Sequence, residues 1–245
     1  MKQTRLIMGM PITVEINGTA SDADIEMVFA YFTEVDHRYS TYKPDSEISR
    51  INGGLPRSQW SAEMKHVLEL CDETKRQTEG YFDITRRNGK LDPSGLVKGW
   101  SINNAAGLLR KRGFDHFYIE AGGDIQAAGN NTEGQPWRVG IRNPFNTNEI
   151  VKTIQLSGNA IATSGTYIRG EHIYNPHGDY KPANSIASLS VIGPNIYDAD
   201  RFATAAFAMG TQGVRFIESL PDLEGYMVDN EGMATLTSNF ERYVV

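Results

Sequence analysis

The order of hydrophobic periods along this chain constrains its fold more than any other feature. Segments with helical spacing are predicted to begin near residue 22 and to lie at about 46–52, 61–77, 97–112, 198–210 and 211–219. Segments with strand character are predicted at 4–16, 115–120, 123–129, 137–142, 151–156, 159–163, 185–193, 224–229 and 233–238. Because the strand-rich middle is not a regular βαβ series, we expect an α+β fold rather than a doubly wound parallel sheet.

The charge balance excludes one broad class of protein. The chain has 245 residues, with 24 Lys+Arg against 30 Asp+Glu and a formal net charge of -6. A nucleic-acid-binding protein normally carries a basic surface that neutralises phosphates, so we do not expect one here. A phosphate-bearing ligand is still possible, because local residues or a metal ion can supply positive charge. No linker divides the chain, so we expect one domain over residues 1–245.

The cysteine content and the apolar runs indicate the cellular setting. The single cysteine, Cys71, excludes an internal disulfide bond and any site built from several cysteines, and its helical spacing predicts a packed core thiol. No apolar run approaches 18 residues, so we expect no membrane-spanning segment. The first residues resemble neither a signal peptide nor a lipid-anchor motif. We therefore expect a cytoplasmic protein, unless a leader was removed from the sequence.

Two residues at helical spacing offer oxygen ligands. Asp200 and Thr204 are four residues apart at the start of the predicted helix 198–210, so they share one face. A carboxylate and a hydroxyl at this spacing can bind Mg²⁺, which leaves coordination positions for water and phosphate oxygens. The alternative is that Asp200 only stabilises the helix N-terminus and that Thr204 packs in the core.

The segment LDPSGLVKGWSIN is a candidate anion site. Asp92 precedes a Pro-Ser-Gly turn, and Lys98 follows near the start of a predicted helix. Backbone N–H groups, a lysine and a helix N-terminus that meet at one point can bind an anion. The alternative is an ordinary turn with Lys98 in solvent. Tyr42, in a polar loop, needs either a core contact or a flat ligand for its ring.

Two other motifs are weak. His172 and His177 are five residues apart across Pro176, which places them in a loop rather than at the i, i+4 spacing of helical zinc ligands. Gly89 and Gly95 are six residues apart, and Leu96 follows where a phosphate-binding P-loop needs lysine. We therefore expect neither a zinc pair nor a P-loop.

Eight short motifs follow one another over about residues 8 to 210. They are Met8-Gly9, STYKPDSEISRIN, YFDIT, DPSGLVKGWSIN, AGGDI, AIATSGTY, HIYNPHG and DADRFATAAFAMG. Each motif alone is weak, but together and in this order the chain resembles the ApbE family, the FAD:protein FMN transferases. The resemblance implies an α+β architecture of two T-fold-like halves packed together, with the FAD site at their junction.

The same resemblance implies an activity. Members of the family bind FAD and Mg²⁺, cleave the pyrophosphate, release AMP and attach FMN through a phosphoester bond to a threonine of a target flavoprotein. Their usual acceptors resemble redox-pump or respiratory subunits. A Mg²⁺-dependent FAD pyrophosphatase, in which water replaces the threonine and the products are FMN and AMP, is one alternative. A non-catalytic protein that binds or stores FAD is another.

The resemblance also assigns a metal site. Asp200 and Thr204 match the family's metal-binding side chains, and Gly95 matches the residue that gives its backbone carbonyl to the same ion. An ion held there would polarise the diphosphate. Lys98 is expected to add a fixed positive charge. Asp200 and Lys98 are therefore expected to be catalytic.

Further residues are implied to contact FAD. Asp92 and Lys98 match contacts to the flavin nucleotide, and His172, followed by Ile173, matches a position near the diphosphate. The positions that match the lining of the FAD pocket are Met8, Tyr42, Tyr81 and Phe82. His172 is also the expected catalytic base, because histidine exchanges protons near neutral pH. A metal-bound hydroxide or Asp200 itself is the alternative base.

Two segments depart from the family pattern. The loop that usually begins Asp-Leu-Gly-Gly is DPSG here, and Pro93 removes one amide donor from it. HIYNPHG replaces the more usual ending Asp-Pro-Arg-Thr-Gly, so Asn175 and His177 stand where an acid and an arginine are expected. The altered HIYNPHG segment is the best support for the storage alternative. The retained Asp200 and Lys98 argue against that alternative, since storage needs no phosphate-activating metal.

Overall fold

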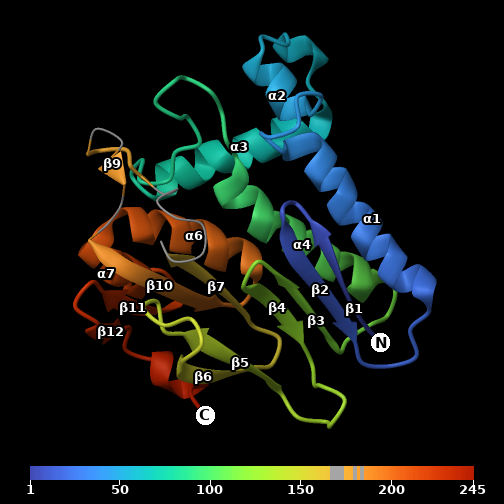
Figure 1. Ribbon diagram of the computed structural model, residues 1–245, viewed down its shortest axis with the longest axis vertical. Helices are drawn as coiled ribbons and strands as arrows, with labels where there is room; N and C mark the ends of the chain where they lie inside the picture. The colour runs from blue at the N-terminus through green and yellow to red at the C-terminus, as the bar shows by residue number, and fades with distance from the viewer. Residues whose placement is uncertain (166–173, 179–180, 183–184) are drawn as a thin grey trace.

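The centre of the molecule is one antiparallel sheet (Figure 1). The computed structural model describes residues 1–165, 174–178, 181–182 and 185–245. The sheet has eight strands in the order β1-β2-β3-β4-β7-β10-β11-β12. Their bounds are Lys2–Ile7, Met10–Ile16, Phe117–Ala121, Asp124–Ala128, Ala160–Gly165, Ile186–Gly193, Glu224–Asp229 and Ala234–Leu236. Two shorter pairs complete the strands: β5 (Trp137–Arg142) with β6 (Ile150–Leu156), and β8 (Tyr174–Asn175) with β9 (Lys181–Pro182).

Helices cover one face of this sheet, and the β5–β6 pair covers the other (Figure 1). The helices on the sheet are α1 (Asp22–Tyr39), α4 (Ser94–Lys111), α6 (Ile196–Ala208) and α7 (Gly213–Glu218). The two faces follow from the alternation of side chains along a strand. On β10, Leu189 and Val191 pack with the helices, whereas Ile192 packs with β5 and β6.

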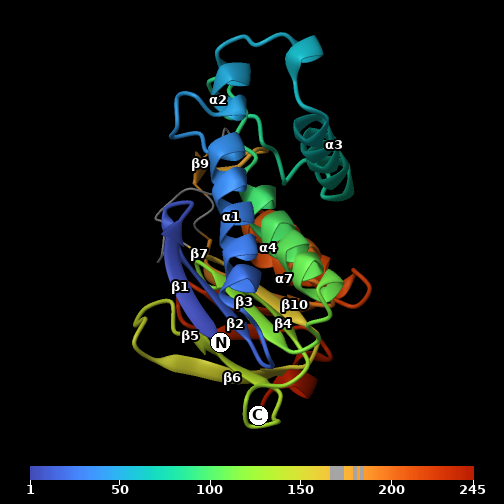
Figure 2. The ribbon, with the colours of Figure 1, turned by 90° about the vertical axis from the view of Figure 1, so that its right-hand side faces the viewer.

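A second core lies beyond the edge of the sheet. It joins α2 (Glu47–Asn52) and α3 (Ala62–Gln77) to the ends of α1 and α4, and Figure 2 shows α2 and α3 projecting away from both termini. Cys71 is buried in this core at 1% exposure, so the predicted core thiol is confirmed. Within the described residues, 3₁₀ segments also occur at Arg57–Gln59, Gly210–Gln212 and Phe240–Tyr243.

The N-terminal strand prediction is wrong in one respect. One strand was expected over 4–16, but the chain forms a hairpin in which Ile7 pairs with Met10. Met8 and Gly9 occupy the two-residue turn with φ angles of 56° and 70°. A two-residue hairpin turn with both φ angles positive matches the right-handed twist of the flanking strands. Since methionine rarely adopts a positive φ, the sequence gives little sign of this turn.

The order of elements repeats once along the chain. The first half runs β1-β2-α1-α4-β3-β4, interrupted by α2 and α3, and the second runs β7-β10-α6-α7-β11-β12. Each half contributes four neighbouring strands to the sheet, which is what two similar halves packed side by side require. The α+β expectation is confirmed. Among the described residues, no helix is both long enough and apolar enough to cross a bilayer.

Candidate functional site

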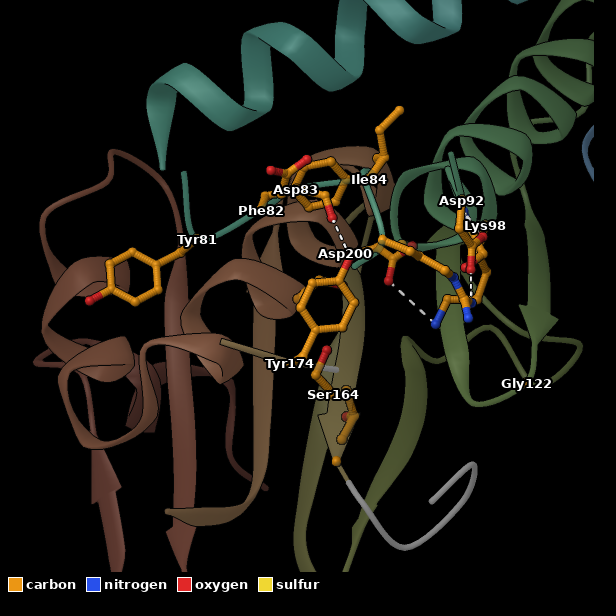
Figure 3. Close-up of a pocket in the computed structure, with 16 residues that line it drawn as sticks. Tyr81, Phe82, Asp83, Ile84, Asp92, Lys98, Gly122, Ser164, Tyr174 and Asp200 are labelled. Carbon is orange, nitrogen blue, oxygen red and sulfur yellow. Dashed lines mark hydrogen bonds and ion pairs between the residues drawn. The ribbon is translucent and has the colours of Figure 1, made fainter. Parts of the chain in front are cut away.

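A pocket opens where the two halves meet, beside the first turns of α4 and the end of β7 (Figure 3). Its empty volume is about 920 Å³, including the part open to solvent. The expected site residues that line it are Tyr81, Phe82, Asp92, Gly95, Lys98, Asp200 and Thr204. These residues come from three of the eight sequence motifs, which therefore meet in one place.

The close crossing of α4 and α6 brings the expected metal ligands together. Gly95 and Gly99 are four apart on α4 and face Asp200 and Thr204, four apart on α6. A Cβ atom on Gly95 would lie 3.3 Å from Thr204 Cγ2, and one on Gly99 would lie 2.6 Å from Asp200 Cβ. At Gly99 only glycine allows the two helices to approach so closely, whereas a Cβ at Gly95 would make a tight contact.

One hydrogen bond couples the two helices at this crossing. The backbone N–H of Gly99 donates to Asp200 Oδ2 at 2.7 Å. In a regular α-helix this N–H would donate to the carbonyl of Gly95, four residues earlier. The Asp200 carboxylate therefore competes with the Gly95 carbonyl for the Gly99 N–H. This competition leaves the Gly95 carbonyl oxygen with capacity for another partner.

Three charged side chains form a cluster at the base of the pocket, and we call Lys98, Asp124 and Asp200 the charged cluster. Lys98 Nζ lies 2.5 Å from Asp124 Oδ2 and 3.3 Å from Asp200 Oδ1. Asp124 comes from the first residue of β4 and accepts the backbone N–H of Thr163 on β7 at 3.1 Å. In the described part of the chain no hydrogen-bond donor other than this ammonium reaches Asp124 Oδ2.

Burial determines the electrostatics of this cluster. Asp124 is 1% and Asp200 2% exposed. Burial raises the pKa of the Asp200 carboxyl to about 7; Lys98 opposes this shift and the Asp124 carboxylate adds to it. When both carboxyl groups are ionised, the two buried carboxylates beside one ammonium carry a residual negative charge, which a further cation would balance.

The donor set fits Mg²⁺. Asp200, Thr204 and the Gly95 carbonyl are hard oxygen ligands, and Mg²⁺ is usually held by one or two carboxylates together with water and substrate phosphates. Across the described residues, no group of three or more His, Cys, Asp or Glu side chains could hold a metal ion by itself. The chemistry of the site therefore suits an ion that is completed by a phosphate ligand.

The predicted anion loop is partly used by the protein itself. Asp92 Oδ1 accepts the backbone N–H of Ser94 at 3.1 Å, and the other carboxylate oxygen pairs with Arg86. α4 already begins at Ser94, so Lys98 lies in its second turn. The alternative of a solvated Lys98 is wrong, because its side chain is only 15% exposed and is paired with two carboxylates.

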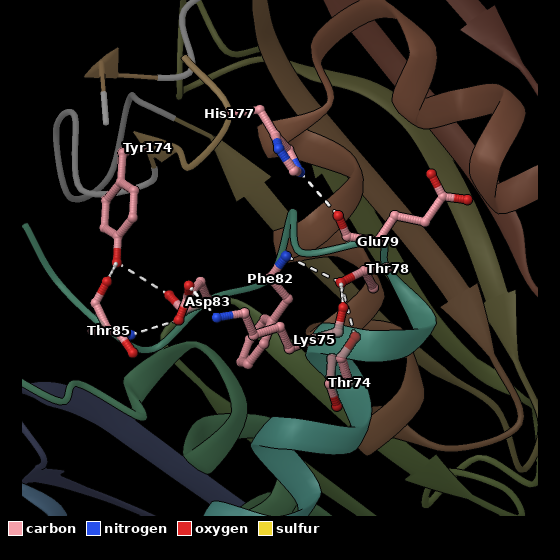
Figure 4. Close-up of polar contacts among 9 residues, drawn as sticks. All are labelled: Thr74, Lys75, Thr78, Glu79, Phe82, Asp83, Thr85, Tyr174 and His177. Carbon is pink, nitrogen blue, oxygen red and sulfur yellow. Dashed lines mark hydrogen bonds and ion pairs between the residues drawn. The ribbon is translucent and has the colours of Figure 1, made fainter. Parts of the chain in front are cut away.

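The segment 79–85, which we call the pocket loop, forms one wall. Phe82 is held at its backbone N–H by the Thr78 hydroxyl at 3.1 Å, and this hydroxyl donates to the Thr74 carbonyl of α3 at 2.8 Å. Asp83 pairs with Lys75 Nζ at 2.7 Å (Figure 4). Side-chain contacts therefore add to the backbone hydrogen bonds of this segment, which belongs to no helix or named strand.

Two residues of the HIYNPHG motif clamp the pocket loop from the other side (Figure 4). The Tyr174 hydroxyl lies 3.1 Å from the Asp83 carbonyl and 3.2 Å from the Thr85 carbonyl, so it can donate to either. His177 Nε2 lies 2.9 Å from the Glu79 carbonyl, a contact in which the ring nitrogen donates. The His177 ring also meets the Tyr81 ring edge-on, with centroids 4.6 Å apart. His177 therefore has a structural contact in this chain.

The remaining expected residues lie outside the pocket lining or outside the described chain. Met8 occupies the β1–β2 turn and packs against both helical cores. Tyr42 is 93% exposed and is close enough to Arg86 to affect its electrostatics. Neither Met8 nor Tyr42 lines the pocket. His172 and Ile173 lie outside the described residues.

The sequence analysis missed Asp124, Tyr174 and Arg86. Asp124 follows two glycines in AGGDI, and nothing local to that motif indicates a salt bridge to a lysine on another element. Its burial, which creates the need for a partner, becomes visible only in the structure.

The comparisons with known proteins agree with this geometry. The family model described as "ApbE family" matches residues 8–88 and 84–227. A Vibrio cholerae protein named FAD:protein FMN transferase is 33% identical over 73% of this chain and 71% of its own length. A Haemophilus influenzae protein of the same name is 25% identical over 91% of this chain and 84% of its own length.

Solved structures are similar in fold. The flavin transferase ApbE from Vibrio cholerae superposes with a TM-score of 0.87 at 23% identity, covering 99% of this chain and 98% of that one. The ApbE protein from Thermotoga maritima gives 0.86 at 19% identity, with the same coverage.

Proposed function

Because this chain belongs to the ApbE family, we propose that it is a Mg²⁺-dependent FAD:protein FMN transferase, acting as one domain over residues 1–245. The proposed substrates are FAD and a threonine of a flavoprotein, such as a redox-pump or respiratory subunit. One observation carries the proposal: Gly95, Lys98, Asp200 and Thr204 converge in one pocket. The relatives named FAD:protein FMN transferase support the same reading.

The proposed reaction exchanges one phosphoester bond for another. The threonine oxygen attacks the phosphorus on the FMN side of the FAD pyrophosphate, and a new P–O bond forms. The P–O bond to the bridging oxygen breaks, and AMP leaves with that oxygen. The hydroxyl proton passes to a base, for which we propose His172. A metal ion held by Asp200, Thr204 and the Gly95 carbonyl would neutralise charge on the diphosphate oxygens.

The residues of the charged cluster have separate tasks in this proposal. Lys98 presents an ammonium, fixed by Asp124 and Asp200, to the developing charge on the phosphates. Asp124 is a positioning residue, because it contacts Lys98 and Thr163 but does not line the pocket. Tyr81 and Phe82 supply aromatic surface for the flavin nucleotide.

Incubation with FAD, Mg²⁺ and a panel of threonine-bearing flavoprotein subunits tests the proposal. We expect a covalent FMN adduct on one acceptor, seen by in-gel flavin fluorescence and intact mass, together with AMP. EDTA should abolish the adduct. Free FMN and AMP with every acceptor would replace the proposal by the pyrophosphatase, and intact bound FAD would replace it by the storage protein.

A further inference from the structure

The hairpin between α3 and α4 carries positive charge that the proposed reaction does not use. Thr85 and Leu91 form an antiparallel bridge, and the N–H of Arg86 donates to the Lys90 carbonyl at 2.8 Å. The segment 85–91, TRRNGKL, contains three basic residues and no acidic one, in a chain of net charge -6. We call it the basic hairpin.

This hairpin is held in a fixed position beside the pocket. The side chain of Asn52, the last residue of α2, donates to the Leu91 carbonyl at 2.9 Å and accepts the Leu91 N–H at 2.7 Å. Gly89 closes the turn with a φ of 77°. In Figure 1 the segment linking α3 to α4 projects near β9. The backbone of the hairpin is therefore ordered before any partner binds.

Its charges divide into two groups. Arg86 lines the pocket and is neutralised by Asp92. Arg87 and Lys90 are exposed, do not line the pocket, and in the described structure have no ion-pair or hydrogen-bond partner for their charged groups. A ligand confined to the pocket would not meet these two cations. A macromolecule that covers the pocket mouth would meet them.

We propose that the basic hairpin is a docking surface for the acceptor protein and binds acidic side chains near the acceptor threonine. This inference rests on the proposed function, in which a polypeptide hydroxyl must reach a phosphorus inside the pocket. The net charge of -6 on the chain as a whole repels an acidic partner. Two unpaired cations beside the mouth attract it to the one place where transfer is possible.

Charge reversal at the exposed positions tests the docking surface. The variant Arg87→Glu/Lys90→Glu is compared with Arg215→Glu/Lys111→Glu, which makes the same change in net charge at exposed positions outside the pocket lining. The acceptor is the subunit that gives the FMN adduct with the unaltered protein. We expect kcat/KM for this acceptor to fall about tenfold or more at low salt, because steering of this kind changes association rates by factors of 10 to 10³.

Two further readouts separate docking from chemistry. The dissociation constant for FAD and the rate at saturating acceptor should stay within about twofold of the unaltered protein, since neither cation lines the pocket. A glutamate decapeptide should inhibit transfer by the unaltered protein and by the control variant, but not by the hairpin variant. Unchanged kcat/KM for the acceptor, or an equal loss in FAD affinity, would overturn the inference. Absence of an adduct with the unaltered protein would instead reject the proposed function.

Discussion

The charged cluster and the pocket loop line the same pocket but are held in different ways. The cluster depends on two helices of 18 and 13 residues, α4 and α6, whose backbones meet at Gly95 and Gly99. The pocket loop belongs to no helix or named strand, and side-chain hydrogen bonds from Thr78, Tyr174 and His177 add to its few backbone hydrogen bonds.

This difference separates two requirements of a group-transfer site. Charges that must act on a phosphate need positions fixed within fractions of an ångström, and long packed helices provide that precision. A wall that shapes a ligand can be altered without disturbing the core, because each of its contacts contributes about 1 kcal/mol. We therefore expect substitutions in the cluster to have larger effects than substitutions in the pocket loop.

The largest expected effect is on the metal-dependent step. Asp200→Asn keeps the size of the side chain and an acceptor for the Gly99 N–H, but removes the charge. We expect the transfer rate to fall by about 10³, while FAD binding weakens much less. Single-turnover adduct formation measures the rate. The control is Asp198→Asn on the same helix, whose carboxylate pairs with Arg201 rather than Lys98. Near-normal transfer by Asp200→Asn would contradict the metal assignment.

Lys98→Met tests the electrostatic repulsion between the buried carboxylates of Asp124 and Asp200. Removing the shared ammonium leaves both carboxylates uncompensated, so we expect a loss of about 3 kcal/mol in the free energy of unfolding when EDTA is present. Saturating Mg²⁺ should stabilise this variant more than the unaltered protein. Chemical denaturation with and without Mg²⁺ measures both.

The matched control for Lys98→Met is Lys43→Met. Lys43 pairs with Asp36, but its side chain is 35% exposed, so its loss should cost below about 1 kcal/mol. Equal destabilisation by the two variants would mean that Lys98 contributes no more to stability than an ion-paired lysine that is partly exposed.

Gly99→Ala tests the helix crossing without changing a charge. The new Cβ would overlap Asp200 Cβ and lie 2.7 Å from the Ile196 carbonyl oxygen, so we expect a loss of about 2 kcal/mol in stability and reduced transfer. Gly107→Ala on the same helix meets no atom within 4 Å, and it should stabilise the protein by up to about 1 kcal/mol. Thermal unfolding of both variants gives the comparison, and stabilisation by Gly99→Ala would refute the crossing.

Tyr174→Phe should have the smallest effect. It removes the hydroxyl that reaches the Asp83 and Thr85 carbonyls, at a cost of about 1 kcal/mol. We expect KM for FAD to rise a few fold with little change in kcat, as measured by steady-state AMP release. Tyr243→Phe, whose hydroxyl contacts only the exposed Arg242, is the control. A loss in kcat as large as that of Asp200→Asn would contradict the expectation that the charged cluster affects the transfer rate more than the pocket loop does.

The sequence predicts the regular elements well because their hydrophobic periods are local. The helices expected at 61–77 and 198–210 occur at Ala62–Gln77 and Ile196–Ala208. The shared face of Asp200 and Thr204 followed from the same periodicity. The eight family motifs, taken together, predicted that these distant segments share one site, which no local pattern could indicate.

Contacts between distant residues were beyond local reasoning. The bond from Gly99 to Asp200 spans 101 positions, and Asp124 lies on a strand that the sequence does not link to α4. The roles of Tyr174 and His177 depend on main-chain carbonyls of the pocket loop, which any residue type supplies. The repetition is carried by the order of the strands and helices, so no sequence period reveals it.

The division of the charged cluster between α4, β4 and α6 has a consequence for the synthesis and folding of the protein. A nascent chain that has emerged only as far as β4 already contains Lys98 and Asp124, but it lacks Asp200 and Thr204. Substrate capture must therefore wait until the second half has been synthesised and has docked its helix against Gly95 and Gly99. From that moment any ligand that binds the completed pocket stabilises both halves together by mass action. Occupancy of the site thus reports that the whole molecule has been assembled.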